Sequence, residues 1–305
     1  MIKYVSYLIF AFALLLGACT NSTIEDSDKI IITTTIAQIG DAVKNIGGEH
    51  VDVHSLMGPG VDPHIYQATQ SDIRRLGDAD IIFYNGLNLE GNMVEIFEKM
   101  RNEKPTFAVT DAIPKQYLLQ DMDDVNEVDP HIWFDIDLWS MVVEYIAEQL
   151  IEYAPEYEED FKNNSEKYLA ELTELKIFAK NEMEKVPEQS RILVTAHDAF
   201  GYFANAYGFE VVGIQGLSTD SDYGIRDIQN VIDILVENEI KAVFTESSVS
   251  DRAMNSVIEG AKARGFEVEI GGSLFSDAIG EEGTEEGTYI GMYKHNVNVI
   301  VESLQ

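Results

Sequence analysis

The chain of 305 residues has a single cysteine, Cys19, so it forms no disulfide within itself. It has 21 lysines and arginines against 54 aspartates and glutamates, and its formal net charge is −33. A chain this acidic repels nucleic acid, which argues against binding through a basic patch. After residue 18 no apolar run is long enough to cross a bilayer. We therefore expect a globular body that depends on its own apolar core.

The N-terminus has the pattern of an export signal. Residues 1–18 carry one charge, Lys3, and an apolar run over residues 7–16 that is short for a membrane span. The order Leu-Gly-Ala-Cys ending at Cys19 resembles the lipobox of bacterial lipoproteins, in which the cysteine is lipidated and becomes the first mature residue. We predict a signal peptide and then a lipidated polar tether over 19–28. The alternative is an ordinary cleaved signal followed by an incidental buried cysteine.

From residue 29 onward, short β-branched runs alternate with segments of helical periodicity. The expected strands are residues 29–34, 51–56, 80–86, 106–110, 191–196, 209–214, 241–246 and 266–271. A glycine-rich loop is expected from 272 to 288 and a closing helix after it. Such alternation predicts parallel sheets covered by helices. The sequence thus predicts an α/β protein with an N-terminal lobe at 29–154 and a C-terminal lobe at 188–305.

The segment between the two lobes differs from both. Residues 156–186 contain no glycine or proline, and Phe161, Tyr168, Leu172 and Leu175 form an apolar stripe at helical spacing. A helix of about 30 residues would be about 45 Å long, more than a helix needs to cover a sheet. We expect one long connecting helix over 155–187. Two helices with a break near residues 163–164 are the alternative.

Three of the six histidines stand where a ligand site is expected. His64 follows the strand at 51–56, His197 follows the strand at 191–196, and His131 leads into a helix. Ligands of open α/β sheets bind beyond the carboxyl ends of the strands. Asp-Pro-His occurs twice, ending at His64 and at His131, and imidazole suits transition metals. The sequence therefore predicts a metal site, while the remaining histidines are expected to pack or to face solvent: His50, His54 and His295.

A carboxylate should complete this set, because a divalent cation needs negative charge. Asp277 follows the strand at 266–271, Glu246 ends the strand at 241–246, and Asp198 stands beside His197. Position alone does not separate Asp277 from Glu246.

The ordered motifs resemble a known family. GPGVDPHIYQATQSD, DPHIWFD, TAHDAFGYFANAYG, QGLSTDSDYG, FTESSVS and LFSDAIG look like the metal-binding lipoproteins of ABC importers for manganese, zinc and iron, over nearly the whole mature chain. The resemblance implies two Rossmann-like lobes joined by one long helix, with the metal in the cleft between them. It assigns His64, His131, His197 and Asp277 as ligands and leaves Glu246 as a supporting residue.

The resemblance also implies partners and a location. We expect an extracytoplasmic monomer, held to the cell membrane by its lipid, that delivers Mn²⁺, Zn²⁺ or Fe²⁺ to an ABC permease with a cytoplasmic ATPase. Two cues about the metal disagree. Many manganese-preferring relatives have glutamate where His197 stands, whereas zinc-dedicated relatives often carry a histidine-rich loop where this chain has LLQDMDDVNEV. Three histidines and an aspartate suit all three ions.

Two other functions remain open from the sequence. Three histidines and a carboxylate could serve a metal-dependent hydrolase, although no HExxH helix, GxSxG elbow or P-loop is present. A surface adhesin of the same fold is the other alternative.

Overall fold

The structure, a computed structural model, describes residues 29–120, 127–221 and 223–305. The predicted signal peptide and Cys19 lie outside the described residues. The first half has a four-stranded parallel sheet of order β2-β1-β3-β4. Its strands are β1 (Ile30–Thr34), β2 (Val51–Ser55), β3 (Ile81–Tyr84) and β4 (Thr106–Ala108). Its helices are α2 (Ala37–Gly47), α3 (Gln70–Asp78), α4 (Val94–Arg101) and α5 (Ile136–Tyr153).

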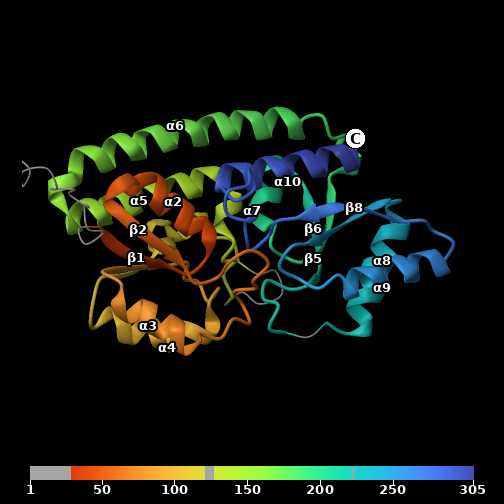
Figure 1. The fold of residues 1–305 in the computed structure, drawn as a ribbon. Helices are drawn as coiled ribbons and strands as arrows, with labels where there is room; N and C mark the ends of the chain where they lie inside the picture. The colour runs from red at the N-terminus through yellow and green to blue at the C-terminus, as the bar shows by residue number, and fades with distance from the viewer. Residues whose placement is uncertain (1–28, 121–126, 222) are drawn as a thin grey trace, which may run out of the picture.

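Local capping fixes where two of these helices begin. Thr69 and Asp72 form a reciprocal capping box at the start of α3, with Asp72 Oδ2 accepting from the Thr69 amide at 2.8 Å. Asp135 caps α5 by accepting from the amide of Asp137 at 2.8 Å. The four helices cover both faces of the sheet: α2 and α5 lie on one face, and α3 and α4 lie on the other (Figure 1).

The predicted connecting helix is confirmed as one uninterrupted helix. After a 3-10 turn at Pro155–Tyr157, α6 runs over Glu158–Met183, and its buried residues include Phe161, Tyr168 and Leu172. No break occurs at residues 163–164; the Asn164 side chain instead donates to the Ile46 carbonyl at 3.0 Å. The helix extends along both halves of the molecule, contacting α2 and α5 of the first half and the closing helix of the second (Figure 1).

The second half repeats the alternation. Its strands are β5 (Ile192–His197), β6 (Glu210–Gln215), β7 (Ala242–Glu246) and β8 (Glu269–Leu274). Its helices are α7 (Gly201–Tyr207), α8 (Ile225–Glu237), α9 (Arg252–Ala263) and α10 (Tyr289–Leu304). The strands form two parallel pairs, β5–β6 and β7–β8, and the inner strands β5 and β7 are neighbours.

The observed strands differ from their predicted ranges by one to three residues, and the last strand is shifted most. The strand expected at 266–271 is found as β8, three residues later, so Gly272 belongs to a strand and not to the predicted loop. The reason is the close approach of α10. A Cβ atom at Gly272 would lie 2.5 Å from Val299 Cγ1, and one at Gly271 would lie 2.8 Å from Ser303 Cβ. These glycines make room for a helix and do not mark a loop.

The halves share one apolar core. The larger cluster of buried residues extends from β1 through α5, α6 and α7 to α10 and includes Trp133, Phe200 and Tyr293. A second cluster lies between the strands of the second half and helices α8 and α9. Among the described residues, no helix combines the length and apolarity needed to cross a membrane.

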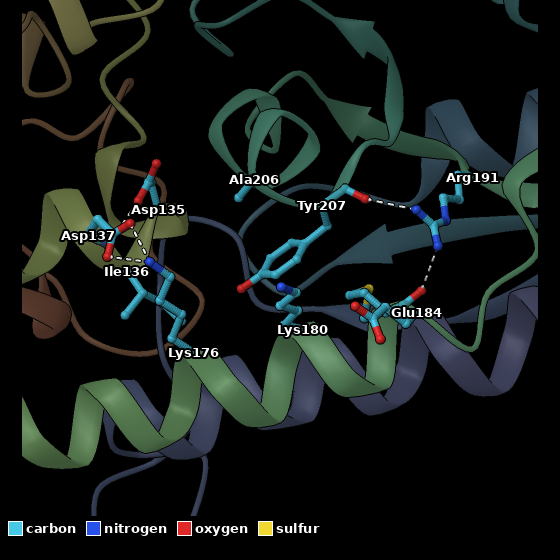
Figure 2. Close-up of a pocket in the computed structure, with 10 residues that line it drawn as sticks. Asp135, Ile136, Asp137, Lys176, Lys180, Glu184, Arg191, Ala206 and Tyr207 are labelled. Carbon is cyan, nitrogen blue, oxygen red and sulfur yellow. Dashed lines mark hydrogen bonds and ion pairs between the residues drawn. The ribbon is translucent and has the colours of Figure 1, made fainter.

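The underside of α6 shows how both halves meet this helix. A cavity of about 400 Å³ lies between the start of α5, α6 and the end of α7 (Figure 2). On one side Lys176 Nζ contacts Asp137 Oδ1 at 2.7 Å, and on the other Arg191 donates to the carbonyls of Tyr207 and Met183, both at 3.3 Å. Six of the ten residues that line this cavity are charged and none is a histidine, so it is distinct from the predicted metal site.

Candidate metal centre

The structure brings the four predicted ligands together between the two halves. His64 lies in the loop after β2, His131 directly before a 3-10 turn at Ile132–Phe134, His197 at the end of β5, and Asp277 three residues after β8. One ligand atom from each of these residues lies within 4.8 Å of the others, and all four residues are buried. No other such group is found in the described part of the chain.

Their contacts leave metal-binding atoms directed at a common centre. His64 Nε2 and His131 Nε2 are 3.3 Å apart, and Asp277 lies 3.4 Å from His131 Nε2 and 3.3 Å from His197 Nε2. His197 Nε2 and Asp277 Oδ1 are buried and make no hydrogen bond to any described residue. Buried polar atoms normally have a partner, so this arrangement suits a bound cation.

His131 is held by its own triplet. Asp129 Oδ1 accepts from the His131 amide at 2.9 Å and contacts its Nδ1 at 2.7 Å. This fixes the ring with Nε2 directed at the centre, as is usual for histidines that bind metals. The aspartate of the second triplet therefore supports the ring of its own histidine.

His197 is held by Glu246, the residue that position alone could not separate from Asp277. Glu246 Oε1 accepts from the His197 amide at 2.8 Å, and Oε2 contacts Nδ1 at 2.5 Å. The carboxylate therefore lies behind the ring, on the side opposite the centre, and it does not belong to the group of four. Asp198 does not belong to it either.

The carboxylates beside His131 and His197 raise the pKa of both imidazoles. Burial alone would lower the pKa of His131, but the charges of Asp129 and Asp277 outweigh it and raise that pKa to about 9. Glu246 and Asp277 likewise outweigh burial at His197 and raise its pKa well above the usual value. At His64 burial prevails and lowers the pKa to about 3. Burial opposes ionisation of Asp277, but His197 and His131 hold its pKa well below the ordinary range.

The other histidines have structural contacts elsewhere. His50 stacks on Tyr157 and lies 2.9 Å from Asp160, which joins the start of β2 to α6. His54 is exposed beside Asp52, and His295 Nε2 contacts the Ser273 carbonyl at 3.0 Å.

Sequence reasoning missed the contacts that join the ligand segments across the cleft. Trp133 Nε1 donates to the Ser276 carbonyl at 3.0 Å, which places the His131 segment against the residue before Asp277. Thr219 Oγ1 donates to Asp62 Oδ2 at 2.5 Å. Both pairs are far apart in the sequence, and no local pattern indicates them.

Comparison with known proteins identifies the family. The model of the family "Zinc-uptake complex component A periplasmic" matches residues 32–303. The chain belongs to this family. It is 49% identical over 299 residues to the manganese-binding lipoprotein MntA of Bacillus subtilis, covering 98% of this chain and 97% of that protein.

Solved structures agree with the fold. The periplasmic zinc-binding protein TroA of Treponema pallidum has a TM-score of 0.88 at 44% identity, over 90% of this chain and 99% of that chain. The Fe(III)-bound YtgA of Chlamydia trachomatis has a TM-score of 0.82 at 28% identity, over 90% of this chain and 98% of that chain. The predicted α/β class with parallel sheets, a long helix and a buried site of three histidines and an aspartate is confirmed.

Family membership also decides between the function classes. The chain is a metal-binding solute-binding protein of the ABC-importer type, which acts outside the cytoplasm and is not an enzyme. A substrate-binding component of this type implies a permease as its partner. The hydrolase alternative is thereby excluded.

Proposed function

We propose that His64, His131, His197 and Asp277 coordinate one divalent metal ion and carry it to the permease. The observation that supports this most directly is the convergence of four ligand atoms within 4.8 Å, two of which have no hydrogen-bond partner among the described residues. Glu246 and Asp129 would act behind the histidines by fixing the ring orientation, without binding the ion.

The ligand assignment is tested by removing one ligand from each half. Replacing His64 and His197 together with alanine should abolish stoichiometric binding of Zn²⁺ and of Mn²⁺ in calorimetry. His54→Ala is the matched control, because it removes an exposed histidine outside the site and should leave binding unchanged. If the double variant kept the affinity of the parent protein, the assignment would be wrong.

The transported metal is a separate proposal. We infer that the site takes both Zn²⁺ and Mn²⁺, and that supply decides which is carried. Three imidazoles and one carboxylate suit both ions, and intrinsic affinity rises from Mn²⁺ to Zn²⁺ in most such sites. Relatives are named for either metal: MntA for manganese and TroA for zinc. Elemental analysis of protein purified under native metal supply, with Mn²⁺/Zn²⁺ competition alongside, tests this.

We further propose how the chain is organised on the cell. Residues 29–154 and 188–305 would act as two lobes on the connecting segment 155–187, and a lipid on Cys19 would hold the monomer to the membrane through residues 19–28. The ordered elements on either side of α6 support the division into lobes. The charge of −33 supports a protein without nucleic-acid partners.

A further inference from the structure

The two Asp-Pro-His triplets are identical in sequence but differ in what their aspartates contact. Asp129 accepts from both the amide and the ring of its own histidine, His131. Asp62 accepts from the His64 amide at 2.9 Å through Oδ1, while its Oδ2 accepts from Thr219 Oγ1 at 2.5 Å. Thr219 belongs to the second half. The first triplet therefore reaches across the cleft, and the second is complete within its own segment.

The His64 ring has the least support of the three. Carboxylates hold the Nδ1 atoms of His131 and His197, whereas none of the described residues holds that of His64 in this way. The backbone carbonyl of His64 accepts only a long contact of 3.4 Å from Asn92. His64 also lines a cavity of about 410 Å³ with Leu87, Asn88, Leu217 and Ser218. It is thus the proposed ligand nearest to an opening.

Thr219 is itself held to the second half. Gln215 Nε2 donates to the Thr219 carbonyl at 3.3 Å and to the Ser221 carbonyl at 3.0 Å. Gln215 lies at the end of β6 and pairs in register with His197 on β5. A continuous series of contacts therefore joins one proposed ligand to another: His197, Gln215, Thr219, Asp62 and His64.

The opposite side of the site has a different construction. The buried indole of Trp133 donates to the Ser276 carbonyl, and the Trp133 carbonyl accepts from Tyr289 Oη at 2.7 Å. The core shared by the two halves lies behind these contacts. The segments of His131 and Asp277 are therefore joined by buried contacts, whereas the His64 segment is joined to the second half through the partly buried hydrogen bond of Asp62.

We propose that the Asp62–Thr219 hydrogen bond holds His64 on the metal and that breaking it opens the site at the cavity lined by His64. Asp62 and Thr219 are then positioning residues that set the rate of metal release. This inference rests on the proposed function, since it takes His64 as a ligand.

The test compares two substitutions of one side chain. Thr219→Val keeps the shape and removes the hydroxyl, while Thr219→Ser keeps the hydroxyl. The Zn²⁺-loaded full chain is mixed with excess EDTA, and release is followed by tryptophan fluorescence; of the two tryptophans, Trp133 and Trp139, the ring of Trp133 lies 5.3 Å from that of His131. We expect Thr219→Val to release Zn²⁺ about tenfold faster, equivalent to about 1.4 kcal/mol, and Thr219→Ser to stay within about twofold of the parent.

Three controls make the result specific. Thr173→Val removes a hydroxyl of α6 that bonds only within its own helix, so its release rate should equal that of the parent protein. Equal melting temperatures of the metal-free variants show that the fold is intact. Adding Thr219→Val to Asp62→Ala should produce no further acceleration, because Asp62→Ala has already removed the hydrogen bond.

Two results would overturn the inference while leaving the proposed function standing. One is a Thr219→Val variant that binds one Zn²⁺ and releases it at the parental rate. The other is equal acceleration in the valine and serine variants, which would assign the effect to the loop and not to the hydroxyl. Failure of the parent protein to bind one equivalent of Zn²⁺ would instead reject the proposed function, and this inference with it.

Discussion

Replacement of Glu246 by glutamine tests how the site controls one histidine. In the structure, Oε1 accepts from the His197 amide at 2.8 Å, and Oε2 lies 2.5 Å from His197 Nδ1. Glutamine can keep the first contact, but its amide nitrogen then faces Nδ1. That nitrogen is a donor, so it favours the tautomer that carries its proton on Nε2, the atom required for the metal.

The expected loss of Zn²⁺ affinity in Glu246→Gln can be estimated in two ways. Removing a partner that orients a metal-bound histidine typically weakens metal affinity about 10- to 100-fold, equivalent to about 1.4–2.7 kcal/mol. A hydrogen bond to a charged group contributes about 1.5–3 kcal/mol, which agrees. We therefore expect Glu246→Gln to raise the Kd for Zn²⁺ by one to two orders of magnitude while one equivalent still binds.

Asp129 provides a matched comparison. One oxygen of Asp129, Oδ1, accepts from both the amide and the ring nitrogen of His131. Asparagine can keep that oxygen in place, so Asp129→Asn should weaken Zn²⁺ binding less than Glu246→Gln does. Glu259→Gln, at an exposed position on α9, is the neutral control.

The assay is competition with a chromogenic chelator of known affinity, with the metal content measured independently. Loss of stoichiometric binding in Glu246→Gln would show that Glu246 is itself a ligand. An unchanged Kd would show that the carboxylate has no role in orienting His197. Either result would refute the reasoning.

Three further predictions concern the rest of the molecule. Cys19→Ser should release the protein from the membrane fraction and abolish incorporation of labelled palmitate; membrane retention would contradict the proposed tether. Burial raises the pKa of Asp41, so the folded state favours its protonated form and loses stability as pH rises through that pKa. Asp41→Asn removes this cost, so urea denaturation should show the variant gaining stability relative to the parent between pH 4 and pH 7, and a constant difference would contradict this. Leu172→Ala, at a fully buried position of α6, should lower the free energy of unfolding by about 2–5 kcal/mol, whereas Ile177→Ala, which is 57% exposed, should have little effect; equal losses would contradict the packing of α6.

Much of the fold follows from local patterns. The stripe of Phe161, Tyr168 and Leu172 predicts a helix with one buried face, and α6 buries these residues. The closing helix expected after residue 288 is found as α10, which begins at Tyr289. Such elements are well predicted because periodicity and capping are local properties of the chain.

Tertiary contacts determine the bounds of those elements that local sequence patterns do not predict. Gly272 is typical of a loop by composition, yet it lies in β8 beside Gly271, because α10 passes too close to both for side chains. The position of α10 depends on the packing of the whole second half, and no window around residue 271 contains that information. Glycine therefore indicates a loop only where no neighbouring element packs closely against it.

The choice between Asp277 and Glu246 shows the same limit at the site. Glu246 ends β7 and Asp277 follows β8, the two strands of one parallel pair. Glu246 is in register with Leu274, so both carboxylates stand at the same sheet edge. Glu246 ends its strand and reaches only the Nδ1 side of His197. Asp277 lies three residues beyond its strand, in a segment that Trp133 contacts through the Ser276 carbonyl, and it faces the Nε2 side. Since Trp133 and Ser276 are 143 residues apart, strand position predicts two candidate carboxylates, and only the three-dimensional contact separates the one that faces the metal from the one that orients its ligand.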